Sequence, residues 1–133
     1  MVADAVRRCR NWPCEVPDTG TLRGYLIALI EMTAAHIAGE DGPLLAGVLM
    51  AMRRDPELAA EMRTVSADKP DLSGQICARA VARGQLPAGC RAGLIEELVP
   101  PLLFMRGIVR GDPIDHDYIQ HVVDDIVLPL LTA

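Results

Sequence analysis

Aromatic side chains are scarce in this chain of 133 residues, which contains one Trp, two Tyr and one Phe although half of its residues are hydrophobic. The hydrophobic residues are mainly Ala, Leu, Ile, Val and Met, a composition that favours an all-helical domain over a β-sandwich or a β-barrel. The length allows one sizeable hydrophobic core and is short for two. We therefore expect a single all-helical domain that spans residues 1–133.

Long hydrophobic runs are also missing. The longest run, from Gly42 to Met52, is interrupted by Pro43 and has the length of a buried core helix, not of a membrane span. Asp4 and the segment Arg7-Arg8-Cys9-Arg10 place charges where a signal peptide would need its apolar segment. We therefore expect no membrane contact and a cytoplasmic location.

The chain also lacks the usual signatures of an active site or a metal site. Its four cysteines show no CxxC spacing, so neither a disulfide framework nor a zinc site is expected. Asp117 and His121 share one helix face without a HExxH motif, which is more typical of a solvated surface than of a metal site. Neither Ser66 nor Ser73 stands in a Gly-x-Ser-x-Gly motif, and no glycine-rich phosphate loop follows a strand. We predict no catalytic residue, no metal and no cofactor, and therefore no enzyme.

Basic residues do not gather into a patch. The formal net charge is −5, and the arginines are spread along the chain without interleaved aromatic residues. Proteins that bind nucleic acid normally present a basic surface to the phosphates. This chain by itself is expected to bind DNA poorly.

Two consecutive amphipathic helices are predicted at the C-terminal end, from about Arg91 to Arg110 and from about Asp115 to Leu131. Each has a wider apolar arc than one contact needs, so we expect the pair to pack inward on its own domain and outward on a second copy, in a four-helix dimer interface. Pro100 and Pro101 remove helical hydrogen bonds from the first helix, so we expect a bend there. The residues expected in the interface are Leu94, Leu98, Leu102, Met105, Ile119, Val122, Val123 and Ile126.

Capping residues delimit further helices upstream. Asp18, Thr19 or Thr21 is placed to cap one helix, Asp55 is placed to cap another, and Gly84 is typical of a left-handed helix end. We expect an antiparallel helical bundle of about six to seven helices, of which the last two form the dimer interface. The predicted upstream helices cover residues 2–11, 22–38, 43–52, 56–65 and 72–83.

Three motifs occur in an order and spacing that resemble those of a known family. They are Arg53-Arg54-Asp55-Pro56-Glu57-Leu58-Ala59, Arg79-Ala80-Val81-Ala82-Arg83-Gly84-Gln85-Leu86 and Gly111-Asp112-Pro113-Ile114-Asp115-His116-Asp117-Tyr118-Ile119. From about Pro17 to its end, the chain resembles the C-terminal regulatory domain of TetR-type transcriptional repressors. The resemblance implies an all-helical domain that dimerises through its last two long helices and encloses a hydrophobic effector pocket between its central helices.

Members of that family also carry an N-terminal helix-turn-helix domain that reads an operator as a dimer. We expect that domain to be missing from this chain, in which residues 1–16 would be the remnant of a connecting helix and a linker. The chain would then be the effector-sensing and homodimerisation domain of a repressor and would contact DNA only through the missing domain. A bound ligand would loosen operator binding by shifting the protein between two conformations.

The central helices are candidates for lining the effector pocket because those over 22–38 and 43–52 are apolar on nearly all sides. For a small hydrophobic effector the candidate residues are Leu26, Leu29, Ile30, Thr33, Leu49, Met52, Ile76 and Phe104. Alternatively, the methionines of these helices merely fill the core. Two other functions also remain open: a stand-alone helical ligand-binding or dimerisation module without DNA-binding activity, and a helical enzyme-like binding protein.

Overall fold

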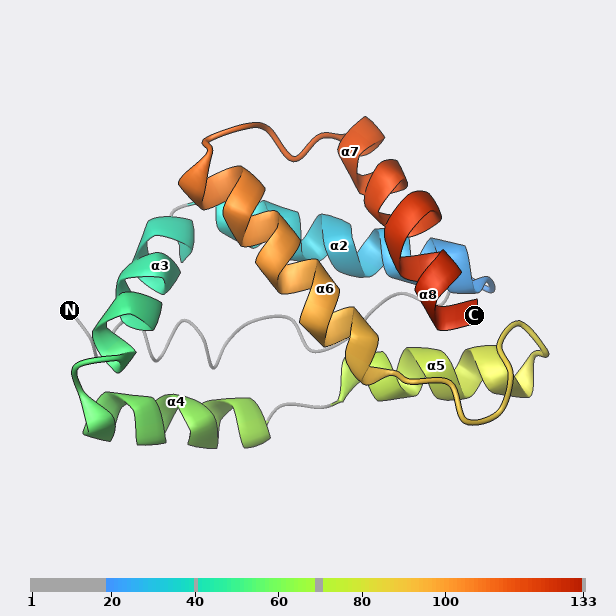
Figure 1. The fold of residues 1–133 in the computed structure, drawn as a ribbon, viewed down its shortest axis with the longest axis horizontal. Helices are drawn as coiled ribbons and strands as arrows, with labels where there is room; N and C mark the ends of the chain where they lie inside the picture. Colours follow the sequence, from blue (N-terminus) through green and yellow to red (C-terminus); the bar gives the residue numbers. More distant parts are fainter. Residues whose placement is uncertain (1–18, 40, 69–70, 133) are drawn as a thin grey trace.

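The computed structural model describes residues 19–39, 41–68 and 71–132, and every regular element within these ranges is a helix (Figure 1). The all-helical prediction is therefore confirmed. The segment over residues 1–16, expected to hold a remnant helix and a linker, lies outside the described residues. The elements are α2 Leu22–Ala38, α3 Asp41–Met52, α4 Pro56–Ala67, α5 Leu72–Ala82, α6 Gly93–Phe104, η1 Met105–Val109, α7 His116–His121, η2 Val122–Val127 and α8 Leu128–Thr132.

The helix ends follow the capping residues that the sequence predicted. Thr21 caps α2, because its Oγ1 accepts a hydrogen bond of 3.0 Å from the backbone N–H of Gly24. Asp55 caps α4, because its Oδ1 accepts bonds of 3.1 Å from the N–H groups of both Glu57 and Leu58. Gly84 follows α5 with φ +74°, a left-handed conformation in which a side chain would be strained. Without Thr21 and Asp55, the backbone N–H groups that they bond in the first turns of α2 and α4 would lack a partner within the helix.

The main hydrophobic core surrounds α2, which contacts α3, α5, α6, α7, η1 and η2. Figure 1 shows α2 crossing behind α6 and beside the C-terminal helix, which consists of α7, η2 and α8. Neighbouring helices therefore cover several sides of α2. This arrangement explains why its sequence has no continuous polar face. We call this core the main cluster; its most deeply buried side chains are Tyr25, Leu26, Ile30, Ile76, Ile95, Leu103, Val122, Val123 and Val127.

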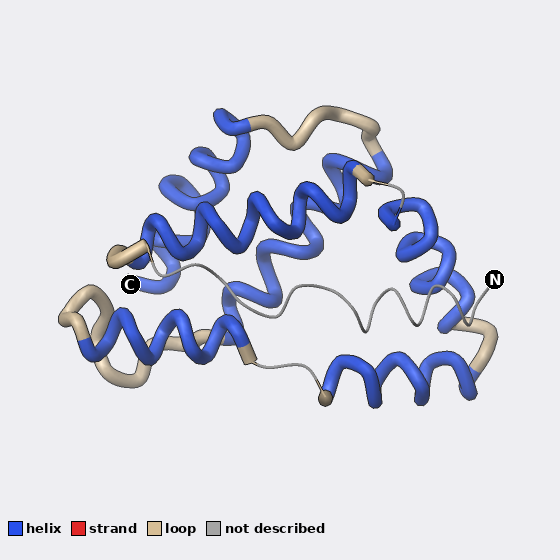
Figure 2. The backbone as a smooth tube through the Cα atoms, turned by 180° about the vertical axis from the view of Figure 1, so that it is seen from behind, coloured by secondary structure: helices blue, strands red, loops and turns tan. Residues whose placement is uncertain are grey.

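A second, smaller hydrophobic cluster lies between α3 and α4. It contains Leu45, Val48, Leu58, Met62 and Val65, and we call it the second cluster. Figures 1 and 2 place α3 and α4 together at one end of the molecule, away from α7 and α8. The fold is therefore a helical bundle with a helical hairpin, α3 and α4, attached to one end.

The two C-terminal helices have nearly the predicted bounds. The first, α6, passes through Pro100 and Pro101 and continues as the π-helix η1 to Val109. Two carbonyl groups that lose their helical donors to these prolines belong to Glu96 and Glu97, and both residues are exposed, so water can reach them. The bend expected at the proline pair stays a prediction. Within the described ranges, every helix is too short or too polar to cross a bilayer.

Candidate functional site

The eight residues predicted to line an effector pocket fall into three environments. Leu26, Ile30 and Ile76 are completely buried in the main cluster. Leu29 and Phe104 are half-buried at the edge of that cluster, whereas the remaining three lie elsewhere. The structure thus brings five of the eight predicted residues to one core.

The other three predicted residues are Thr33, Leu49 and Met52. Thr33 is half-buried, and its hydroxyl donates a hydrogen bond of 2.9 Å to the carbonyl oxygen of Leu29, so its polarity is satisfied within α2. Met52 is half-buried against the second cluster. Leu49 is 40% exposed and is not in either cluster. Leu49 is therefore the most exposed of the eight predicted pocket residues.

Phe104 connects the two hydrophobic clusters. Its ring lies at the end of α6 and packs against both the main cluster and the second cluster. We call this junction the core seam. A junction between two separate cores is easier to open than the interior of either one, because fewer close-packed side chains must separate. Phe104 is therefore the predicted pocket residue that packs against both clusters.

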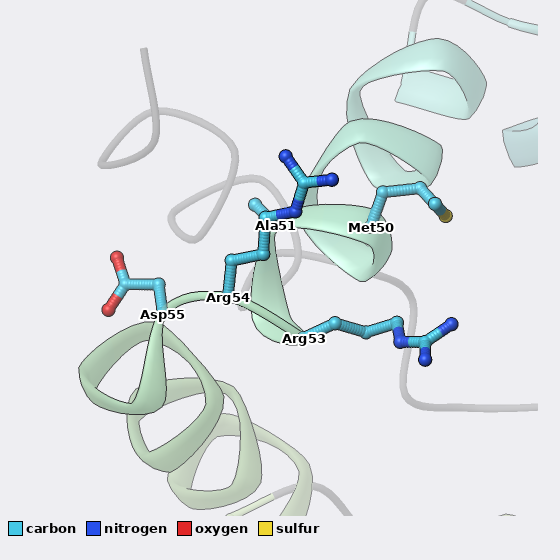
Figure 3. Close-up of a pocket in the computed structure, with 5 residues that line it drawn as sticks. All are labelled: Met50, Ala51, Arg53, Arg54 and Asp55. Atoms are coloured by element: carbon cyan, nitrogen blue, oxygen red, sulfur yellow. The ribbon is translucent and has the colours of Figure 1, made fainter.

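A separate hollow of about 790 Å³ lies at the junction of α3 and α4 (Figure 3). Among the described residues it is lined by Met50, Ala51, Arg53, Arg54 and Asp55. Figure 3 shows the two arginine side chains extending in different directions, and Asp55 already caps α4 through its carboxylate. None of the eight predicted pocket residues lines this hollow. The sequence did not predict this hollow, because its Arg53-Arg54-Asp55-Pro56 segment indicates only the end of one helix and the cap of the next.

The residues predicted for the dimer interface also divide into two groups. Ile119, Val122 and Val123 are buried within the chain's own main cluster and present no surface to a second copy. Leu94, Leu98, Leu102 and Ile126 are half-buried, and Met105 is 54% exposed. The exposed group is therefore concentrated on α6 and η1.

Two further apolar side chains that were not in the predicted interface are exposed on the C-terminal elements. Val109 is 69% exposed on η1, and Leu130 is 44% exposed on α8. Leu98, Leu102, Met105 and Val109 recur at spacings of three and four residues, which places them along one face of α6 and η1. We call these four residues the outer stripe.

An ion pair fastens the C-terminal helix to α2. The guanidinium group of Arg23 donates two hydrogen bonds to the carboxylate of Asp124, from Nε to Oδ1 at 2.8 Å and from Nη2 to Oδ2 at 3.0 Å. The hydrogen bond from Arg23 lowers the pKa of Asp124, and the same bond raises the pKa of Arg23. This two-pronged geometry fixes the orientation of both side chains as well as their distance.

The loop before α7 is held by an arginine. Arg106 lies over the ring of Tyr118, with its guanidinium carbon 4.0 Å from the ring centroid. Its Nε also donates a hydrogen bond of 2.7 Å to the carbonyl oxygen of Pro113. Asp115 then caps α7 by accepting a bond of 2.9 Å from the N–H of Tyr118. These contacts set the course of the connection between the two C-terminal helices.

The polar face of α7 and η2 pairs its histidines with neighbouring side chains. His121 Nδ1 lies 2.7 Å from a carboxylate oxygen of Asp125, and His116 Nε2 lies 2.9 Å from Nε2 of Gln120. The described part of the chain contains no group of three or more His, Cys, Asp or Glu side chains that could hold a metal ion.

The sequence of the chain matches that of known proteins. The family described as "Tetracyclin repressor-like, C-terminal domain" matches residues 16–126. An uncharacterised HTH-type transcriptional regulator of Mycobacterium tuberculosis (strain ATCC 25618 / H37Rv) is 31% identical over 117 residues, which cover 87% of this chain and 57% of that protein. The DNA-binding transcriptional repressor TetR of Mycobacteroides abscessus is 34% identical over 119 residues, which cover 88% of this chain and 62% of that protein. The chain therefore spans about three fifths of the length of these relatives, and no solved structure matches it.

Proposed function

Because the chain belongs to the tetracyclin repressor-like C-terminal domain family, a family of transcriptional regulators, we propose that it senses a small hydrophobic effector and forms a homodimer. The observation that carries the first part is the position of Phe104 between the main cluster and the second cluster. The family match supports a ligand-binding domain, and we place the apolar effector at the core seam because Phe104 packs against both clusters there.

The effector enters at the core seam and separates the α3–α4 hairpin from the main cluster. Phe104 packs against both clusters at this seam; Met62 belongs to the second cluster, and Met52 packs against it. Methionine side chains are flexible and polarizable, so they adapt to ligands of different shapes. Leu26, Ile30 and Ile76 support the main-cluster side from within the core and do not need to contact the ligand.

The effector controls DNA binding through a helix-turn-helix domain in the longer protein. The relatives are named as HTH-type and DNA-binding regulators, and this chain matches about three fifths of their length. A ligand that binds one conformation of the dimer more tightly shifts the population toward it and changes the spacing of the two DNA-reading domains. The DNA upstream of the codon for Met1 tests this part: an in-frame helix-turn-helix segment supports it, and a stop codon directly before a ribosome-binding site contradicts it.

Two methionines on the same helix provide a matched test of the ligand position. Met52 is half-buried against the second cluster, whereas Met50 is 67% exposed and lines the separate hollow. The neutral apolar fluorophore N-phenyl-1-naphthylamine serves as the probe in a fluorescence titration. If it binds at the core seam, Met52→Ala and Phe104→Ala should each weaken binding by about tenfold, which corresponds to about 1.4 kcal/mol, and Met50→Ala should leave it unchanged.

The opposite pattern would contradict the proposed pocket. If Met50→Ala weakens binding and Met52→Ala does not, the probe occupies the hollow at the α3–α4 junction. A titration that shows no saturable binding to the wild-type chain would contradict an effector site for apolar compounds. Urea unfolding of each variant controls for loss of fold, since a variant that is partly unfolded would lose binding for an unrelated reason.

The second copy in the homodimer packs on the outer stripe. Val109 and Met105 are the most exposed large hydrophobic residues on α6 and η1. An exposed apolar stripe of this kind is typical of a two-fold interface in which the same patch of both copies meets itself. Ile119, Val122 and Val123 contribute to this interface indirectly, by fixing the C-terminal helix on its own core.

A further inference from the structure

The turn between α3 and α4 forms a hollow of about 790 Å³ whose backbone is fixed by hydrogen bonds. The N–H groups of Arg54 and Asp55 both donate to the carbonyl oxygen of Ala51 at 3.0 Å, and the N–H of Ala59 donates to that of Asp55 at 3.0 Å. The described residues that line the hollow therefore start from a defined backbone. We call it the junction hollow; its lining is Met50, Ala51, Arg53, Arg54 and Asp55 (Figure 3).

The ionisable side chains of this lining carry a positive net charge. Arg53 and Arg54 contribute guanidinium groups and Asp55 contributes a carboxylate, whereas the formal net charge of the whole chain is −5. The carboxylate already accepts hydrogen bonds of 3.1 Å from the N–H groups of Glu57 and Leu58, so the positive end of α4 offsets part of its charge. The junction hollow is therefore a positive site on an acidic chain, and it favours an anion.

The guanidinium groups of Arg53 and Arg54 form no ion pair with the residues that the structure describes. By contrast, those of Arg23 and Arg106 are engaged in hydrogen bonds with Asp124 and with a backbone carbonyl group. A guanidinium group offers five N–H donors that match the oxygens of a carboxylate or a sulfonate. Figure 3 shows the two side chains extending in different directions, so one arginine pairs with the anionic group of a ligand and the other adds to the positive potential.

Met50 supplies an apolar surface beside these charges. Its side chain is 67% exposed, and that of Ala51 is half-buried next to it. A methionine side chain is flexible and polarizable, so it adapts to apolar groups of different shapes. The volume of the junction hollow lies within the range that is usual for sites of small organic ligands. The lining thus combines what a charged group needs with what an apolar group needs.

We propose that the junction hollow binds a small amphipathic anion, that is, an organic carboxylate or sulfonate with an apolar body. The anionic group pairs with Arg53 or Arg54, and the apolar body contacts Met50 and Ala51. The site is distinct from the core seam, because neither Phe104 nor any residue of the second cluster is in its lining. The proposal therefore does not depend on the effector or the dimer proposed above.

The test compares two fluorophores that differ by one anionic group. The probe 8-anilino-1-naphthalenesulfonate has the ring system of N-phenyl-1-naphthylamine and an added sulfonate. We expect it to bind the wild-type chain saturably, and the double variant Arg53→Gln/Arg54→Gln to bind it about tenfold more weakly. Met50→Ala should also weaken its binding, whereas Arg63→Gln, the same charge change at an exposed residue of α4 outside the lining, should not. Added NaCl should weaken binding to the wild type more than to the double variant.

Three results would overturn the proposal. The first is a wild-type chain that shows no saturable binding of the sulfonate probe. The second is equal weakening by Arg63→Gln and by the double variant, since the probe would then sense only the charge of the whole chain. The third is a double variant with a lower urea midpoint and unchanged binding, since Arg53 and Arg54 would then serve only the negative end of α3. The neutral probe reports on the core seam separately, so its failure to bind would leave this test intact.

Discussion

Replacing Val109 with Asp should split the proposed dimer while leaving each chain folded. Val109 is 69% exposed in the single chain, so a partner would bury about two thirds of its side chain. Complete burial of a Val side chain stabilises by roughly 1.5 kcal/mol, so each copy contributes about 1 kcal/mol and a two-fold interface about 2 kcal/mol. Loss of this term alone raises the dimer Kd by about 30-fold, and the buried charge of Asp raises it further.

Val122→Ala is the matched control from the other side of the same hairpin. Val122 is completely buried in the main cluster, so removing two methyl groups should cost about 2 kcal/mol of folding free energy, including the cavity that they leave. Sedimentation velocity over a concentration series measures the Kd, and urea unfolding monitored by circular dichroism measures the stability. We expect Val109→Asp to raise the dimer Kd and Val122→Ala to lower the stability of the fold. A Val109→Asp variant that dimerises like the wild type, beside a Val122→Ala variant that is monomeric at unchanged stability, would refute the reasoning.

Two further predictions concern stability. Asp55→Ala removes the side chain that accepts hydrogen bonds from two N–H groups at the start of α4, so it should lower the free energy of unfolding by about 1 kcal/mol. The control is Glu61→Ala, which changes an exposed residue in the middle of α4. Equal urea midpoints for the two variants would contradict the role of the cap. Asp124→Asn should remove part of the acid dependence of stability. Because Arg23 lowers the pKa of Asp124 in the folded chain, the stability that this carboxylate contributes is fully present above its ordinary pKa near 3.8 and is lost as the pH falls through the lower folded value. Thermal unfolding measured between pH 7 and strongly acidic solution should therefore show the wild type and the variant converging at low pH, and a constant difference at every pH would count against the pair.

The helix boundaries could be predicted from the sequence because they depend on a few neighbouring residues. The side chains of Thr21 and Asp55 bond to N–H groups two or three positions ahead, and Gly84 meets a backbone requirement at its own position. Such contacts are the same in any fold that contains the helix. The all-helical class could be predicted for the same reason, because local patterns in the sequence indicate each helix.

The division of the apolar residues between core and surface could not be predicted in the same way. On the C-terminal helix, Val122, Val123 and Ile126 belong to one broad apolar arc, and the sequence does not say which part of that arc faces inward. The structure buries the first two and leaves Ile126 half-buried, because α2 and α6 pack against one side of η2. The core seam at Phe104 likewise depends on tertiary packing between distant segments, which periodicity does not encode.

The contacts between helices also determine which part of the domain can respond to an effector. The start of α2 is held by Gln85, and its first turn is tied to η2 through Arg23 and Asp124, so α2 and the C-terminal helix should move as one unit. The α3–α4 hairpin has its own small hydrophobic cluster, and Phe104 links that cluster to the main one. We therefore expect an effector that enters the core seam to displace α3 and α4 relative to the main cluster, whereas the ion pair of Arg23 and Asp124 holds α2 to the C-terminal helix. Hydrogen exchange should accordingly change in α3 and α4 when the apolar probe binds, and a change confined to η2 and α8 would place the effector in a different part of the domain.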